Sequence, residues 1–218
     1  MRERELEIAV GAGGVVRGDL VVPDGVRAVV VFAHGSGSSR RSSRNREVAR
    51  ALQARGFATF LLDLLTDDEA VLDERTAQFR FDIDRLARRV ELAVDALGRE
   101  QLTAALAVGL FGASTGAAAA LVAAARLPHP VRAVVSRGGR PDLAGTALPL
   151  VVAPTLLIVG GRDDVVLGLN RDAAAHLAGP HELVVVPDAT HLFPEPGALD
   201  QVARLAADWF SVHLPVEA

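Results

Sequence analysis

The sequence contains neither cysteine nor lysine. Without cysteine, the chain can form no disulfide bond, no thiolate metal site and no cysteine nucleophile. Without lysine, it cannot form the Schiff base that one class of carbonyl chemistry requires. These two absences exclude several kinds of covalent catalysis before any motif is considered.

The sequence also lacks a basic surplus and a long apolar run. Its 218 residues carry a formal net charge of −4, which argues against a nucleic-acid partner because no excess positive charge is available to displace phosphate counterions. The apolar stretches Ala28–Ala33 and Ala117–Ala125 are too short or too small to span a bilayer. Met1–Val10 is charged and alternating, unlike a signal peptide. We therefore expect a cytoplasmic protein with no membrane partner.

Half of the residues are apolar, enough for a sizeable core in one domain covering residues 1–218. Two alternating segments separated by a glycine-rich turn predict an antiparallel hairpin, and later apolar runs predict parallel strands buried on both faces. The expected strands are Glu3–Val10, Val15–Val22, Ala28–Ala33, Phe57–Asp63, Ala105–Phe111, Val131–Ser136, Thr155–Val159 and Glu182–Val186.

Helical patterns alternate with these strands. The expected helices are Ser42–Arg55, Asp82–Leu97, Thr115–Arg126, Leu169–Leu177 and Pro196–His213. We interpret the charged segment Thr66–Phe81 as an irregular surface crossover. The pattern predicts the α/β class: a three-layer α/β/α sandwich around a mostly parallel eight-stranded sheet with an antiparallel N-terminal hairpin. The short segment between Val131–Ser136 and Thr155–Val159 leaves no room for a large cap.

The strongest chemical signal is the pentapeptide Gly112-Ala113-Ser114-Thr115-Gly116. It follows a predicted strand and opens a predicted helix, the context in which Gly-x-Ser-x-Gly forms a nucleophile elbow. The small residues allow strand and helix to approach closely, and the strained turn lifts the Ser114 hydroxyl to the carboxyl edge of the sheet. Read alone, the motif could also be a glycine-rich turn with a serine N-cap.

An acid and a histidine follow the next two predicted strands. Asp163 comes after Thr155–Val159, and His191 comes after Glu182–Val186. A serine hydroxyl needs an imidazole to remove its proton, and the imidazole needs a carboxylate to orient it. The order Ser114, Asp163, His191 is that of α/β-hydrolase topology. Asp164 is the rival acid, and the other histidines in predicted loops and helices read as surface or packing residues.

A loop rich in glycine and serine, Ala33-His34-Gly35-Ser36-Gly37-Ser38-Ser39, follows the first parallel strand. Acyl transfer needs two backbone amides that face the developing oxyanion. We expect one amide from Thr115 and the other from Ser36, with Gly37 as the alternative donor. We also expect Gly37 to contact the substrate. Read alone, this loop could equally bind phosphate, although the absence of Gly-Lys-Ser/Thr excludes a P-loop.

Arginines are dense near the expected mouth of the site. Arg40, Arg41 and Arg44 follow the glycine–serine loop, and Arg137 and Arg140 follow the strand Val131–Ser136. They can form a solvated, salt-bridged rim. The sharper hypothesis is that Arg137 or Arg140 binds a substrate carboxylate or phosphate. No cluster has metal-ligand spacing, so we expect neither a metal nor another cofactor.

Four motifs resemble the dienelactone-hydrolase-like branch of the α/β-hydrolases, and the resemblance covers about Glu3 to Leu214. It implies the fold and the Ser–Asp–His triad, and it extends to a bacterial set with members fused to a phosphoribosyltransferase domain. Dienelactone hydrolase proper has a cysteine nucleophile and a glutamate on the oxyanion loop, where this sequence has Ser114 and Ser36, so the resemblance favours a carboxylesterase. The motifs are His34-Gly35-Ser36-Gly37, Gly112-Ala113-Ser114-Thr115-Gly116, Gly161-Arg162-Asp163-Asp164 and Ala189-Thr190-His191-Leu192-Phe193.

These observations predict a serine hydrolase that cleaves small carboxylic esters, with short acyl chains, through an acyl-enzyme. Two other enzyme readings use the same triad: a thioesterase or acyltransferase, and a lactone hydrolase. A non-catalytic binding protein that keeps the fold is the alternative from another class. The expected partner is a small-molecule ester, and a homodimer is also compatible with the sequence.

Overall fold

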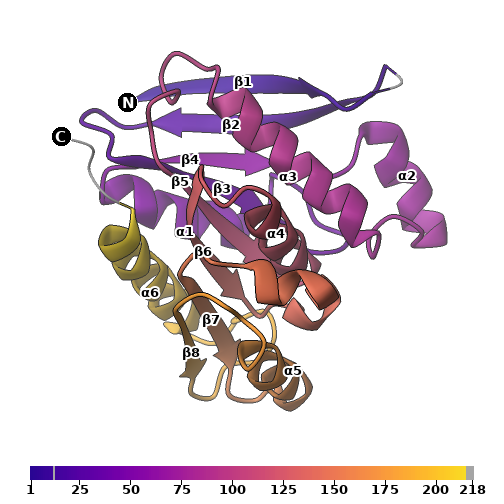
Figure 1. Cartoon of the computed structure of the whole chain (residues 1–218), viewed down its shortest axis with the longest axis vertical. Coiled ribbons are helices and arrows are strands. Elements are labelled where there is room, and N and C mark those ends of the chain that lie inside the picture. Colours follow the sequence, from indigo (N-terminus) through magenta and orange to yellow (C-terminus); the bar gives the residue numbers. More distant parts are fainter. Residues whose placement is uncertain (12, 215–218) are drawn as a thin grey trace.

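An eight-stranded sheet runs through the centre of the chain (Figure 1). The computed structural model describes residues 1–11 and 13–214. The strand order is β1-β2-β4-β3-β5-β6-β7-β8, with β1 and β2 antiparallel and β3 to β8 parallel. The predicted fold class is thereby confirmed. The strands are β1 (Arg2–Ala9), β2 (Val15–Val22), β3 (Ala28–Ala33), β4 (Phe57–Leu62), β5 (Val108–Ala113), β6 (Val131–Arg137), β7 (Thr155–Gly160) and β8 (His181–Val186).

Helices cover both faces of this sheet, and each face has its own apolar core (Figure 1). One face carries α1 (Ser43–Ala54) and α6 (Ala198–His213). The other carries α3 (Ile83–Leu97), α4 (Thr115–Arg126), the 3-10 segment η1 (Pro141–Leu150) and α5 (Asp164–Ala174). None of the helices in the described ranges is long and apolar enough to cross a bilayer.

The burial of the strands matches a sheet that is covered by helices on both faces. Every residue of β3, β4, β5 and β7 is buried, as expected of strands whose sequences are apolar except for Thr59 and Thr155. The outer strand β2 alternates buried and half-buried residues because only one face meets the core. Helix α4 is buried from Thr115 to Ala124, since its alanines allow it to lie close to the sheet.

The segment between β4 and α3 is not irregular as predicted. It contains α2 (Asp67–Thr76), which begins with a capping box in which the Thr66 hydroxyl accepts from the Glu69 amide and the Glu69 carboxylate accepts from the Thr66 amide. The helix has almost no buried face, and so it carries no apolar stripe for periodicity to detect.

Two predicted boundaries are also wrong. Strand β5 runs from Val108 to Ala113, later than the predicted Ala105–Phe111, because its register is set by pairing with β3 and β6. Helix α5 begins at Asp164, directly after Asp163, rather than at Leu169. As a result, β5 ends directly before Ser114 and α5 begins directly after Asp163.

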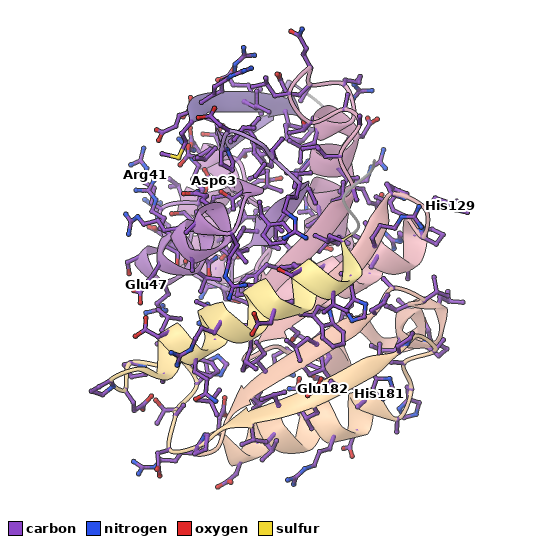
Figure 2. All side chains as sticks on the ribbon, turned by 90° about the vertical axis from the view of Figure 1, so that its left-hand side faces the viewer. Arg41, Glu47, Asp63, His129, His181 and Glu182 are labelled. Atoms are coloured by element: carbon purple, nitrogen blue, oxygen red, sulfur yellow. The ribbon has the colours of Figure 1, made fainter. Side chains whose placement is uncertain are left out.

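The loops that leave the carboxyl ends of the parallel strands gather on one side of the molecule. Figure 2 shows Arg41 and Asp63, which follow β3 and β4, on the opposite side from His129 and His181, which lie before β6 and at the start of β8. In a parallel sheet the carboxyl ends form the usual ligand-binding edge. The exposed His129 and His181 therefore lie away from the candidate site.

Candidate active site

Ser114 occupies the sharp turn between β5 and α4. Its backbone has φ 51° and ψ −122°, outside the regions that non-glycine residues ordinarily adopt. Such a conformation costs of order 1–3 kcal/mol and persists only where the surroundings hold it. The Ser114 carbonyl accepts hydrogen bonds from the amides of Ala117 and Arg140, which secure the turn.

The two glycines of the pentapeptide are required by close backbone approach. A Cβ atom at Gly112 would overlap the backbone of Ala117, and one at Gly116 would overlap the carbonyl of Ala33. A Cβ at Gly35, in the neighbouring loop, would lie 3.0 Å from the Ser114 Cβ. The steric interpretation of the motif thus matches the packing around Ser114.

His191 and Asp163 are paired at the ends of β8 and β7. The Nδ1 atom of His191 lies 2.6 Å from Oδ2 of Asp163, whose side chain is 14% exposed. Asp164, the rival acid, is the first residue of α5 and is exposed. The carboxylate therefore holds one imidazole nitrogen and leaves the other, Nε2, available for a second partner.

Ser114 and His191 line the same cavity of about 200 Å³, together with Gly35, Ser36 and Arg137. The Ser114 hydroxyl makes no hydrogen bond to His191 or to any other described residue. Catalytic hydrogen bonds are often long in unliganded sites and tighten when substrate binds. The arrangement brings a hydroxyl and an imidazole to one cavity, with a carboxylate bound to the imidazole.

The glycine–serine loop after β3 lies beside the start of α4. The hydroxyls of Ser36 and Thr115 are 3.0 Å apart. Neither backbone amide of this pair donates a hydrogen bond within the described chain, and Thr115 is the first residue of its helix, where amides are free to bind an anion. The amide of Gly37, whose φ is 65°, is equally free. Both alternatives for the second oxyanion donor thus remain.

His34 was not singled out from the sequence, yet it connects the glycine–serine loop to the segment after β4. It is 7% exposed. Its Nε2 accepts from the Leu64 amide at 3.1 Å, so the ring proton lies on Nδ1, which donates to the Gly35 carbonyl at 2.9 Å. Burial lowers the pKa of His34 below its ordinary value of 6.5. The neutral ring therefore positions the loop that carries Ser36.

This buried imidazole should make stability fall at acid pH. Below pH 6.5 the unfolded chain binds a proton at His34 that the folded chain does not, so stability declines as pH falls from 6.5 toward the lower folded pKa. The slope from one such group approaches about 1.4 kcal/mol per pH unit. Urea unfolding at pH 7.5, 6.5 and 5.5 measures it.

The matched variant is His34→Gln, which keeps a donor and an acceptor but cannot titrate in this range. The difference in unfolding free energy between wild type and variant should shrink as the pH is lowered. Partly buried His213 also has a pKa lowered by burial, and it contributes equally to both proteins. A difference that stays constant from pH 7.5 to 5.5 would contradict the role of His34.

The predicted substrate-binding arginines lie in different surroundings. Arg140 forms a two-pronged ion pair with Asp142 and is not among the residues that line the 200 Å³ cavity. Arg137 does line it, and at 5% exposed it is buried rather than part of a solvated rim. Arg44, expected at the rim, also lines this cavity, as does Asn45, which the sequence did not single out.

A larger cavity of about 460 Å³ shares Gly35 and Ser36 with the smaller one. Its lining also includes Gly37, Thr115, Leu64 and Leu86. In residues 1–11 and 13–214, no three histidine, aspartate or glutamate side chains are arranged to hold a metal ion. The glycine–serine loop thus contributes to both cavities.

Comparison with known proteins places the chain in a family. A model of the alpha/beta hydrolase fold matches residues 28–153. The crystal structure of dienelactone hydrolase from Anabaena variabilis is 55% identical, with 98% of each chain covered and a TM-score of 0.95. Est1E from Butyrivibrio proteoclasticus shares the fold with a TM-score of 0.79 at 14% identity, covering 95% of this chain and 98% of its own.

Two strains of Mycobacterium tuberculosis each have a protein that is 60% identical over 212 residues and bears the name phosphoribosyl transferase. The match covers 97% of this chain and 47% of those proteins, so the chain spans about half the length of these relatives. The chain belongs to the α/β-hydrolase family, in its dienelactone-hydrolase-like branch.

Proposed function

We propose that this hydrolase is a serine esterase that cleaves short-chain carboxylic esters through an acyl-enzyme. The observation that carries the proposal is that His191, which is paired with Asp163, lines the same small cavity as a serine held in a nucleophile-elbow conformation. A strained serine beside an oriented imidazole is the arrangement that acyl transfer requires.

In the first half of the reaction, Ser114 Oγ attacks the ester carbonyl while His191 Nε2 takes the hydroxyl proton. Asp163 stabilises the imidazolium that results. The amide of Thr115 and that of Ser36 or Gly37 donate to the developing oxyanion. The tetrahedral intermediate then collapses, the carbon–oxygen bond to the alcohol breaks, and His191 returns its proton to the leaving oxygen.

In the second half, a water molecule gives a proton to His191 and attacks the acyl carbon. The ester bond to Ser114 breaks, His191 gives the proton to Ser114 Oγ, and the acid leaves. The same steps open a lactone, which is a cyclic ester, and the name of the relative from Anabaena variabilis is consistent with that extension. No step requires a metal or an organic cofactor.

The size of the cavity beside Ser114 predicts a preference for short acyl chains. At about 200 Å³ it is smaller than the cavities of roughly 300–1,000 Å³ that hold drug-sized ligands. The neighbouring cavity of about 460 Å³ includes neither Ser114 nor His191 in its lining. We therefore expect kcat/KM to decrease from p-nitrophenyl acetate and butyrate to the hexadecanoyl ester. Initial rates measured below the aggregation limit of each ester test this expectation.

The same assay tests the proposed function itself. Absence of hydrolysis of p-nitrophenyl acetate above the rate in buffer would remove the esterase proposal. Faster turnover of the hexadecanoyl ester than of the acetate would leave an esterase but contradict the short-chain preference.

A further inference from the structure

Two arginines beside Ser114 have no acidic partner among residues 1–11 and 13–214. Neither Arg137 nor Arg44 forms an ion pair within the part of the chain that the structure describes. The one hydrogen bond of the Arg137 guanidinium goes from Nη2 to the neutral Oδ1 of Asn45, at 3.2 Å. The Nε atoms of Arg137 and Arg44 are both buried without a hydrogen-bond partner.

The other strongly buried arginines are satisfied differently. Arg89, whose Nε is likewise buried without a partner, forms an ion pair with Glu69, and Arg40 forms ion pairs with Glu5, Asp19 and Asp63. A buried guanidinium without a carboxylate is costly, because nothing in the chain replaces the solvation it loses. Among the described residues, Arg137 thus differs from Arg89 and Arg40 in having no carboxylate partner, and it lines the candidate active site together with Arg44.

The amino end of α1 adds positive potential to the cavity that Arg137 and Arg44 line. The start of α1 faces the cavity through Ser42, Arg44 and Asn45, and its first turn contains no acidic residue. A helix N-terminus contributes roughly half a positive charge. Burial and the nearby charge of Arg44 lower the pKa of Arg137 to about 10, so it still carries its proton at neutral pH. The face of the Phe193 ring, 5.9 Å from the guanidinium, supports it but supplies no charge.

The position of Arg137 relates this charge to the reaction. Its backbone pairs with Ala113 in the sheet, and its carbonyl accepts from the Ser114 amide. The side chain lines the cavity that Ser114 and His191 also line. An anion held by Arg137 and Arg44 would thus lie in the same cavity as the carbonyl that Ser114 attacks.

We propose that the cavity beside Ser114 binds the phosphate group of a phosphorylated ester, held by Arg137, Arg44 and the amino end of α1. Charge balance favours phosphate over a single carboxylate. Two guanidinium groups and a helix terminus match a phosphate monoester, which carries about −1.5 to −2 at neutral pH, whereas one carboxylate leaves most of the positive charge uncompensated. The ester part of this assignment rests on the proposed function, and the phosphate part does not.

The kinetic test uses three methyl esters that differ in charge near the carbonyl: methyl phosphonoacetate, monomethyl succinate and the neutral methyl levulinate. Acid release in a pH-stat at pH 8 gives kcat/KM for each. We expect wild type to favour the phosphonate over the neutral ester by at least tenfold. Arg44→Gln and Arg137→Met should each reduce that preference by about tenfold to a hundredfold, the range for hydrogen bonds to charged groups.

Arg50→Gln is the matched control, because Arg50 is an exposed arginine on the same helix and does not line this cavity. It removes the same net charge and should leave the preference unchanged. Should Arg137→Met fail to fold, the half-buried Arg44 carries the test alone. Equal rates on the phosphonate and the neutral ester, a preference for the succinate, or a loss shared by Arg50→Gln would each overturn the proposal.

Binding of inorganic phosphate to the Ser114→Ala protein separates this proposal from the esterase function. Calorimetry should detect phosphate binding that the added change Arg44→Gln weakens at least tenfold, while Arg50→Gln does not. Arginine-dependent binding without any ester hydrolysis would support the phosphate site and remove the esterase proposal. Hydrolysis of neutral esters without arginine-dependent phosphate binding would do the reverse.

Discussion

Ser114→Ala is expected to lower kcat for p-nitrophenyl acetate by about 10⁶-fold. The loss of the serine nucleophile removes the covalent step on which the imidazole and carboxylate act. Removing one member of such a group therefore abolishes most of the rate enhancement that the whole group provides. A small residual rate can come from the oxyanion donors alone. Because Ser114 is at a positive φ and half-buried, unfolding curves of both proteins must accompany the rates.

A fluorophosphonate probe gives a second readout of the same change. Wild type should gain one adduct by intact mass, and peptide mapping should place it on Ser114. The matched control is Ser211→Ala, which removes a hydroxyl on α6 that donates to the Ala207 carbonyl; labelling and rate should persist. Retention of hydrolysis within tenfold in a folded Ser114→Ala protein would exclude Ser114 as the nucleophile.

The second large effect is expected for Asp163→Asn, with kcat reduced by about 10⁴-fold. An asparagine at this position can favour the wrong tautomer of His191, and it cannot stabilise the imidazolium that forms when Ser114 loses its proton. KM should change much less, because Asp163 lies behind His191 and does not line the cavity.

Asp164→Asn is the natural control, since it makes the same chemical change one residue away. Asp164 is exposed at the start of α5, where a negative charge stabilises a helix by roughly 0.3–1 kcal/mol. Its replacement should lower stability slightly and leave kcat within a few-fold of wild type. Similar losses of kcat in the two variants would mean that neither carboxylate has the specific role given to Asp163.

Local steric rules explain why so much of the elbow was predictable. Gly112 and Gly116 are needed because any side chain there would overlap backbone that lies a few residues away or in the adjacent loop. The apolar runs of β3 and β5 were predictable for a similar reason, because burial on both faces of the sheet leaves no position in them for a polar side chain. These features depend on residues close together in the chain.

Helix α2 shows where periodicity fails. Most of its residues face solvent, so no apolar stripe marks it, although the capping pattern Thr66–Glu69 was a usable local signal. The shift of β5 has another cause. An apolar stretch longer than one strand can pair in several registers, and only its partners β3 and β6 select Val108 as the start.

The arginines near the mouth illustrate a further limit of sequence interpretation. Arg40, Arg44, Arg137 and Arg140 are alike in the sequence, and a solvated rim was a reasonable reading for all of them. In the structure Arg40 and Arg140 form ion pairs with carboxylates. Arg137 is buried near Arg44, and its guanidinium donates only to the amide oxygen of Asn45 among the described residues. Charge pairing depends on segments that are far apart in the chain, and so local pattern cannot distinguish these four residues.

By itself, the sequence determined the strand–helix alternation, the elbow around Ser114, and the order in which serine, acid and histidine follow their strands, because each depends on short-range sterics or on burial of a single element. Only the tertiary structure decided that Asp163 rather than Asp164 faces His191, that His34 joins two loops, and that Arg137 and Arg44 share a cavity without an acid. The physical reason is that side-chain direction and charge compensation are set by packing between distant segments, which no local pattern records.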